Sequence, residues 1–393
     1  MAANPPLRRV VNFLQKRFFN TTPSPKYPKQ PSTILKPKIK TEISNSILPK
    51  SSFSIQYLTK SCGLSLDSAI SASNKVSLEE NNKKQFDSVV LFLKSYNFSD
   101  THIGELVKKR PYVLLCKTST NLEPKFQFLA ESGIKGLNLP KLIVSSPTIL
   151  FRGLNSQLKP AMTIIKRLLP RPDRIEIVVQ RGPWVLTSDW KVMQHNLDYL
   201  IKQGVFESRI KELIVLHPRC LYQDTSRIRY VVKMITEMGV MPCDLKFIHA
   251  LRVMLSLSKS SWERKVKFFE SLGWTNDEVI STFTKSPACL SCSEEKLRNG
   301  IDYFVNTVKI DRQIIISYPK VLMYSVQKRV IPRFTIWKIL EERKLIKGMQ
   351  FIWVLNKSEK EFIEQYVTKY SSEIPHLLQM YLSGKDSISA VRS

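Results

Sequence analysis

The stretch that decides the fold is IGELVKKRPYVL, residues 103–114. Ile103, Leu106 and Val107 have the spacing of one face of a helix, and Pro111 ends that helix because proline lacks a backbone N–H and clashes with the preceding turn. Leu114 then closes a short turn. The same apolar stripe, proline and leucine return along the chain, and the repeat-defining prolines are Pro111, Pro147, Pro183, Pro218, Pro287 and Pro319.

The spacing of these prolines indicates a regular repeat. They are separated by 36, 36, 35, 69 and 32 residues, and the interval of 69 spans two periods. The copy inside that interval lies at Leu245, Ile248 and Val253, where valine replaces proline. A second apolar stripe starts at Leu122 and returns six times, at intervals of 36, 35, 35, 34, 35 and 33 residues. Two registers with one period predict seven copies of a two-helix unit.

Turn chemistry supports this two-helix unit. Prolines stand near the start of the second helix, where a missing N–H costs little: Pro124, Pro160 and Pro332. Glycines that suit a left-handed helix stop follow eleven residues after four of the stripe starts: Gly133, Gly204, Gly239 and Gly273. One helix pair cannot bury its apolar face alone, whereas stacked pairs can. We therefore predict an all-α fold, a curved right-handed or crescent solenoid of about seven or more helix–turn–helix repeats of 32–36 residues, each broken by a proline.

The amino-terminal segment has the pattern of an organellar presequence. Residues 1–40 hold nine Lys and Arg and no acidic residue, and Leu7, Val10, Leu14 and Phe18 fall at helical spacing among the first of these cations. We predict a presequence and linker at residues 1–50, a helical repeat domain at 51–385 and a flexible tail at 386–393. The arginines of the predicted presequence favour a mitochondrial location, with the chloroplast as the alternative.

The charge balance points to a polyanionic partner. The chain holds 61 Lys and Arg against 33 Asp and Glu, a net charge of +28, and removing the presequence still leaves +19. Such a field attracts nucleic acid or anionic lipid. No apolar run reaches the roughly 18 residues of a membrane span, so we expect no membrane insertion.

Sites for catalysis or metal binding are not evident in the sequence. Cys289 and Cys292 form a lone C-x-x-C without the second pair that structural zinc requires, and we expect them in the core. The five His are isolated, and there is no phosphate-binding Gly-rich loop or nucleophile elbow. We therefore expect no metal, no cofactor and no enzyme.

Two rows of basic residues are candidate phosphate contacts, because a nucleic-acid surface needs cations at recurring positions. The row at the start of the second helices is Lys125, Lys159, Arg229, Arg264, Lys265, Arg298 and Arg333. The row beside the repeat proline, or its valine replacement, is Lys109, Arg110, Arg181, Arg219, Arg252, Lys285 and Lys320. Trp184, beside Pro183, is the aromatic candidate for base stacking.

The repeat resembles that of the mitochondrial transcription termination factor (mTERF) family in its plant organellar form. The resemblance rests on the proline-punctuated units and on three flanking segments, Tyr57–Leu64, Met254–Glu263 and Phe362–Tyr381, and it covers roughly residues 53–384. It implies a crescent with a basic inner groove that binds organellar DNA, including double-stranded DNA, or RNA. It further implies a role in transcription initiation or termination, or in RNA processing such as intron splicing.

Other interpretations remain beside this one. A helical-repeat scaffold for proteins of the organellar expression machinery would scatter its cations or expose apolar patches. A pentatricopeptide array has a similar period but lacks a proline inside each unit. We expect a monomer that binds organellar DNA or RNA, with proteins of the expression machinery as further partners.

Overall fold

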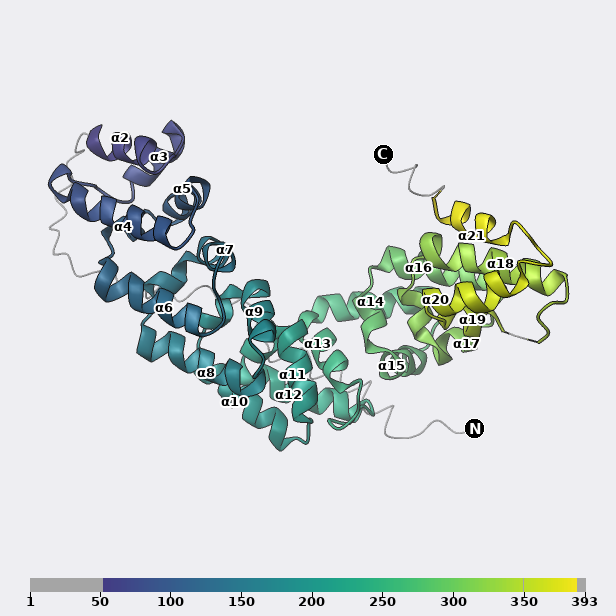
Figure 1. Cartoon of the computed structure of the whole chain (residues 1–393). Helices are drawn as coiled ribbons and strands as arrows, with labels where there is room; N and C mark the ends of the chain where they lie inside the picture. Colours follow the sequence, from purple (N-terminus) through teal and green to yellow (C-terminus); the bar gives the residue numbers. More distant parts are fainter. Residues whose placement is uncertain (1–51, 349, 387–393) are drawn as a thin grey trace. The chain divides into compact units, whose positions relative to one another are not determined.

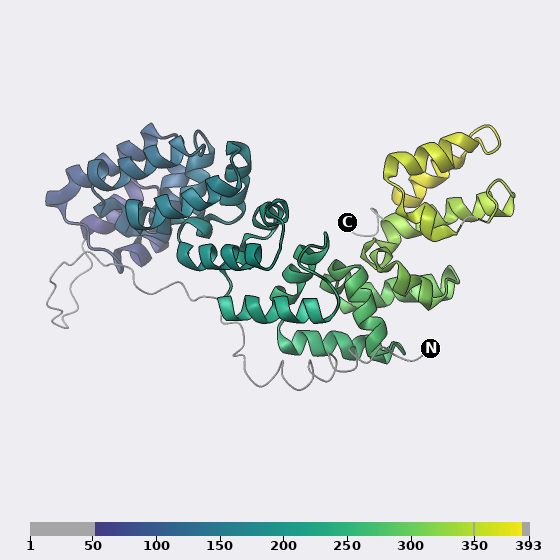
Figure 2. The same cartoon turned by 90° about the horizontal axis from the view of Figure 1, so that it is seen from below.

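The computed structural model describes residues 52–348 and 350–386, and every regular element among them is a helix (Figure 1). These residues form two compact units, one ending at Ile228 and the other beginning at Arg229, within α12. Neighbouring helices lie side by side within each unit in both views (Figures 1 and 2). The all-α repeat class is confirmed. The predicted presequence and most of the predicted tail lie outside the described residues.

Seven helix pairs follow one another, as the two registers predict. The first helices are α5 Asp100–Lys109, α7 Asn138–Ser145, α9 Pro172–Arg181, α11 Glu207–Leu216, α13 Phe247–Ser256, α15 Asn276–Lys285 and α17 Arg312–Ser317. The second helices are α6 Glu123–Glu131, α8 Lys159–Leu168, α10 Trp190–Lys202, α12 Thr225–Glu237, α14 Lys259–Ser271, α16 Glu294–Asp302 and α18 Ile331–Glu342. Their stripe residues form the core; Leu106, Phe126 and Leu197 have no exposed surface.

Each repeat proline begins a short 3-10 helix. These are η2 Pro111–Leu115, η4 Pro147–Phe151, η6 Pro183–Leu186, η7 Pro218–Tyr222, η8 Pro287–Ser291 and η10 Pro319–Met323. Proline fits there because the first position of a helix has no carbonyl for its N–H to meet. At the degenerate copy, Val253 keeps its N–H, so α13 continues to Ser256 and no 3-10 helix follows.

The second helices begin in two ways. Where Pro124, Pro160 and Pro332 stand at the second position, a π turn precedes them, in η3 Thr118–Leu122, η5 Leu154–Leu158 and η11 Val326–Val330. The Val330 N–H, for example, donates to the Ser325 carbonyl at 3.1 Å. Elsewhere a side chain caps the helix amino terminus, as Asp189 does for α10 and Ser293 for α16.

The glycine stops adopt the predicted left-handed conformation, with φ of 76° to 93°. At Gly239, the following Val240 N–H donates to the Ile235 carbonyl at 3.1 Å, which satisfies a free carbonyl at the helix end. Helices α8 and α16, which lack this glycine, end differently: Leu169 takes φ of −126° and ψ of 84°, and Lys309 takes φ of 61°.

Further helices flank the seven pairs. Before them lie α2 Ser52–Lys60, α3 Leu66–Ser73, η1 Glu80–Asn82 and α4 Lys83–Ser95. After them lie α19 Phe351–Asn356, α20 Glu359–Phe362, η12 Ile363–Val367, η13 Thr368–Tyr370 and α21 Leu377–Asp386, and η9 Tyr303–Thr307 extends α16. None of the helices in the described ranges has the length and apolarity that crossing a bilayer requires.

The short helix α19 occupies the place of an eighth proline turn. Leu355 comes 33 residues after Leu322, the leucine that closes η10. Val354 and Leu355 are buried, as are the corresponding Val321 and Leu322. Ile352 therefore stands where the other turns have proline, and the repeat extends one turn beyond the seven copies.

Candidate nucleic-acid interface

Part of the first basic row holds neighbouring repeats together. Lys125, Lys265 and Arg333 lie three residues after the start of their stripes, on the helix face that meets the next repeat. The Lys125 Nζ donates to the Leu150 carbonyl, and the Lys265 Nζ donates to the Cys292 carbonyl at 2.6 Å. Both acceptors lie at the end of a 3-10 helix, where carbonyls lack partners within the helix.

Uncharged side chains do the same at other repeats. The Gln85 amide donates to the Leu115 carbonyl at 2.9 Å. The buried Asn196 amide donates to the carbonyls of Leu221 and Gln223, at 2.9 and 2.8 Å. The shared property is therefore a hydrogen-bond donor that reaches the next turn, and positive charge is incidental to it.

Two repeats supply the donor from one helical turn earlier. Ala161 and Gly300 occupy the usual position and carry no donor. Gln157 and Lys296, four residues before them and so on the same helix face, donate instead to Leu186 at 3.2 Å and to Met323 at 2.6 Å. We call the whole set the turn donors: Gln85, Lys125, Gln157, Asn196, Lys265, Lys296, Arg329 and Arg333.

In the fourth copy the same position holds the buried Val231, whose side chain carries no donor. Arg227 lies four residues before it, as Gln157 and Lys296 do in their repeats. The next repeat is the degenerate one, where α13 continues as a helix and the Val253 carbonyl accepts from the Leu257 N–H at 3.1 Å.

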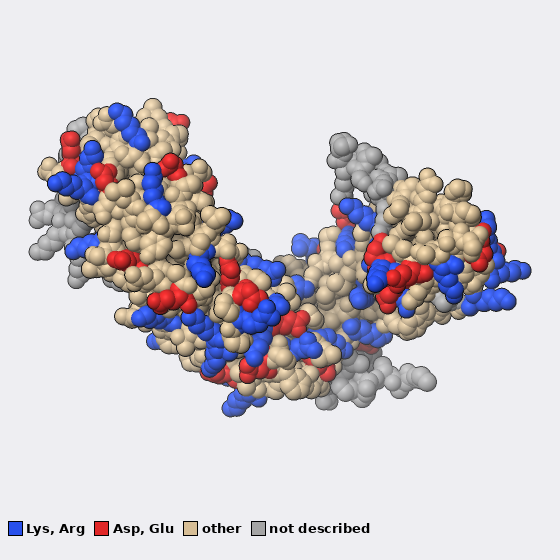
Figure 3. Space-filling view, in the orientation of Figure 1, with Lys and Arg blue, Asp and Glu red and all other residues tan. Residues whose placement is uncertain are grey.

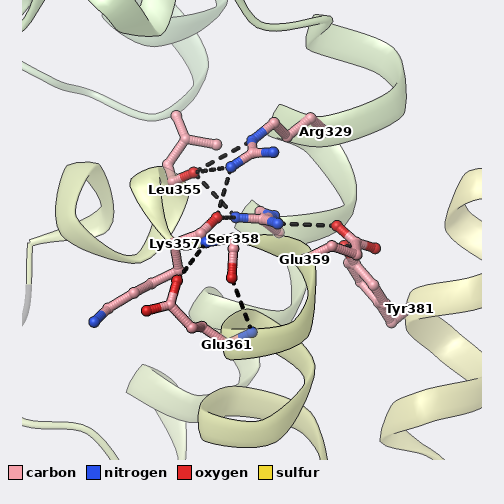
Figure 4. Close-up of polar contacts among 8 residues, drawn as sticks. Arg329, Leu355, Lys357, Ser358, Glu359, Glu361 and Tyr381 are labelled. Carbon is pink, nitrogen blue, oxygen red and sulfur yellow. Dashed lines mark hydrogen bonds and ion pairs between the residues drawn. The ribbon is translucent and has the colours of Figure 1, made fainter. Parts of the chain in front are cut away.

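Arg329 and Arg333 both donate to the turn of α19 (Figure 4). Arg333 has no exposed surface, and its guanidinium donates to the carbonyls of Leu355 and Lys357 at 3.1 and 2.6 Å and to the Glu359 carboxylate at 2.9 Å. Arg329 donates to the same two carbonyls, at 3.0 and 2.6 Å. Burial and the neighbouring arginine lower the pKa of Arg329.

These positions correct the prediction for Lys125 and Arg333 as phosphate contacts. A buried side chain whose donors are engaged by carbonyls has no surface to offer a phosphate, and burial lowers the pKa of Lys125. Lys265 is half-buried and engaged in the same way. The signal that identifies them is the recurrence of Lys, Asn and Arg three residues after a stripe start, which a count of charges overlooks.

The remaining members of the first row are exposed: Lys159, Arg229, Arg264 and Arg298. Arg264 pairs with Glu294 of the next repeat at 3.3 Å, and the Arg298 guanidinium lies 5.1 Å from the Phe268 ring centre. The Lys159 ammonium makes no hydrogen bond or ion pair within the described ranges, so it is available to an external anion.

The second row lies at the proline turns and is largely exposed. Lys109 and Arg181 each reach the last turn of the next first helix, donating to the carbonyls of Val144 at 2.9 Å and Val215 at 3.2 Å. Arg110 and Arg252 are half-buried, and Arg252 donates to the Ser291 hydroxyl at 3.1 Å.

Two further members of the second row share a surface hollow. Lys285 and Lys320 come from successive repeats, and both line a pocket of about 310 Å³ in the carboxyl-terminal unit. Neither ammonium has a hydrogen bond or ion pair to any described residue. The structure thus brings together two predicted contacts that lie 35 residues apart in the sequence.

Trp184 lies in a cluster at the turn of the third copy. Its ring contacts Tyr222 edge-on, with centroids 5.2 Å apart, and the exposed Arg219 lies 5.5 Å from its centre. The Tyr222 hydroxyl donates to the Val185 carbonyl at 2.7 Å, and burial raises the pKa of Tyr222. Trp184 is half-buried, so the arginine is the more accessible member of this group.

Both units carry a net positive charge. Residues 52–228 hold 25 Lys and Arg against 15 Asp and Glu, and residues 229–386 hold 25 against 17. On the face drawn in Figure 3, basic side chains are interspersed with acidic ones in each unit. This view shows no uniformly basic face. The candidate contacts are therefore defined by basic residues at recurring positions of the repeat.

The cysteines give no sign of a metal centre. Cys289 is buried, as predicted, and burial raises its pKa to about 12, whereas Cys292 is only half-buried and so not fully in the predicted core. Among the described residues, no group of three or more His, Cys, Asp or Glu could hold a metal ion.

Comparison with known proteins relates this repeat to one family. The mTERF family model matches residues 7–203, 127–246 and 203–363. The chain is 21% identical over 301 residues to the mitochondrial transcription termination factor MTERF15 of Arabidopsis thaliana, covering 73% of this chain and 56% of that protein. It is 20% identical over 260 residues to the chloroplastic transcription termination factor MTERF8 of the same plant, covering 56% of this chain and 51% of that protein.

The chain therefore spans about half the length of the curated relatives it matches. The family matches together cover most of the chain, including all seven helix pairs and the residues of the second basic row. This protein belongs to the mTERF family.

Proposed function

We propose that this protein binds organellar nucleic acid and regulates organellar gene expression, either in transcription initiation or termination or in RNA processing such as intron splicing. The relatives are named transcription termination factors, one mitochondrial and one chloroplastic, in agreement with an organellar location. The mitochondrion is the first choice, because arginines stand among the first cations of the predicted presequence.

The observation that carries the proposal is the recurrence of exposed cations at equivalent places in successive repeats. Lys159, Arg181, Arg219, Lys285 and Lys320 stand at proline turns or at the start of a second helix, and all are exposed. A phosphate backbone presents anions at regular intervals, so repeated cations give affinity without sequence recognition.

The test is a salt titration of the full chain binding a 20-base-pair duplex and the corresponding single strands, followed by fluorescence anisotropy. The logarithm of affinity should fall linearly with the logarithm of salt concentration, by about 0.7 to 0.9 for each phosphate contact. Absence of binding, or an affinity that does not change with salt, would refute the proposal and favour the scaffold alternative.

A further inference from the structure

The pocket lined by the ends of α15 and α17, the start of η10 and the end of α19 combines features that the phosphate contacts alone do not require. Its lining includes Lys285, Lys320, Tyr318 and Asn356, and no acidic residue. Beside it, the Tyr318 and Trp353 rings meet edge-on with centroids 5.5 Å apart. Two aromatic rings and two cations therefore share one small surface of the carboxyl-terminal unit.

Both rings are exposed to solvent. Tyr318 is 38% exposed and Trp353 is 53% exposed, whereas their neighbours Pro319 and Val354 are buried. No hydrogen bond of the Tyr318 hydroxyl or the Trp353 indole N–H to a described residue is present. The core therefore does not account for these two side chains.

The repeat explains why they lie together. Tyr318 directly precedes Pro319, and Trp353 follows Ile352, the residue that replaces proline in α19. Trp353 thus occupies the position that Lys320 occupies one repeat earlier, 33 residues before. Stacking of consecutive repeats places an aromatic residue and a lysine at adjacent turns.

We propose that this pocket is a subsite for an unpaired nucleotide of a single-stranded nucleic acid. Trp353, the more exposed ring, stacks on the base, the Tyr318 ring contacts the base at an angle, and Lys285 and Lys320 bind the flanking phosphates. Aromatic platforms beside cations are the means by which proteins hold single strands, because every base has a π face. Paired bases inside a duplex do not present that face, so the subsite favours single strands. This inference rests on the proposed function and specifies one of its ligands.

The test compares the full chain with three variants in binding a uridine-rich single-stranded 12-mer RNA, the matching DNA 12-mer and a 20-base-pair duplex. The variants are Trp353→Ala, Trp353→Phe and the double variant Lys285→Gln/Lys320→Gln. Phe206→Ala is the matched aromatic control, since Phe206 is 57% exposed in the other unit. Lys267→Gln/Lys347→Gln is the control of equal charge, with both lysines exposed. Circular dichroism melting checks that each variant is folded.

Trp353→Ala should weaken single-strand binding by about 5-fold or more, as loss of one stacked base predicts, and should change duplex binding less than 2-fold. Trp353→Phe should retain most of the affinity, because its ring still stacks. The lysine pair should weaken single-strand binding more than its control pair does. Equal affinities for the RNA and DNA 12-mers would indicate that the subsite does not contact the 2′-hydroxyl. Tighter binding of the RNA would indicate such a contact, and both outcomes support the subsite.

The subsite is refuted if the wild-type chain binds nucleic acid but Trp353→Ala matches Phe206→Ala, or if it weakens duplex and single-strand binding equally. In those outcomes the proposed function stands. If the wild-type chain binds neither single strands nor duplex, the proposed function itself fails, and the subsite fails with it.

Discussion

Replacing Arg333 with methionine should destabilise the carboxyl-terminal unit, because Arg333 is a fully buried turn donor. Its guanidinium donates to the Leu355 and Lys357 carbonyls and to Glu359, and it lies 4.5 Å from the Phe362 ring centre. Removing one partner of a buried, hydrogen-bonded ion pair costs about 3–5 kcal/mol in unfolding free energy.

The lower end of that range applies here, about 3 kcal/mol, for two structural reasons. The Glu359 side chain is 46% exposed, so water can solvate its carboxylate once the arginine is gone. Arg329 continues to donate to both carbonyls. Methionine keeps much of the buried apolar volume, so the loss reports mainly the missing donors.

Hydrogen exchange measured by mass spectrometry is the suitable assay, because the two units need not unfold together. Amides of α18 and α19 should exchange about 100-fold faster in Arg333→Met, while those of α7 to α11 should be unchanged. Arg343→Met removes an exposed arginine from the same region and serves as the control. A change below 2-fold at α18 and α19 would show that the turn donors do not stabilise the repeat junction.

Two other predictions follow from the same structure. Restoring the repeat consensus by Val253→Pro should lower stability by about 3 kcal/mol or more, since residue 253 lies inside α13 and its N–H is part of the helix; an unchanged melting temperature would contradict the continuous helix. Iodoacetamide at pH 8 should modify the exposed Cys243 and spare Cys289, because burial raises the Cys289 pKa to about 12 and leaves almost no thiolate; peptide mass spectrometry of the folded protein checks this, and equal labelling would contradict the burial.

The sequence was sufficient to predict the repeat, because backbone chemistry dictates its punctuation. Pro111 and its equivalents must end a helix, and Gly239 and its equivalents suit a left-handed stop. Valine at position 253, where the other copies have proline, indicated a deviation from the repeat. The structure shows that α13 continues there and that no 3-10 turn follows it. These effects depend on neighbours in sequence, which periodicity reveals.

The candidate site was less predictable, since it depends on neighbours in space. Lys125 and Lys159 look alike in sequence, yet one donates to the next repeat and the other is exposed. Lys125 is the buried one, because its face of the helix is directed toward the 3-10 turn of the next repeat. The sequence does not point to Trp353, because Ile352 replaces the proline that marks the other turns. Only the packing of the repeats brings the Trp353 ring to Tyr318.

The most direct test of the account measures how binding depends on salt when exposed turn cations are removed. The test variant is Lys159→Gln/Arg181→Gln/Arg219→Gln. The control is Lys60→Gln/Lys166→Gln/Lys202→Gln, which removes three exposed lysines from the last turns of α2, α8 and α10. The slope of log affinity against log salt should become shallower by about 2 to 3 in the test variant and stay near the wild-type value in the control. Equal slopes in all three proteins would contradict the proposed phosphate contacts.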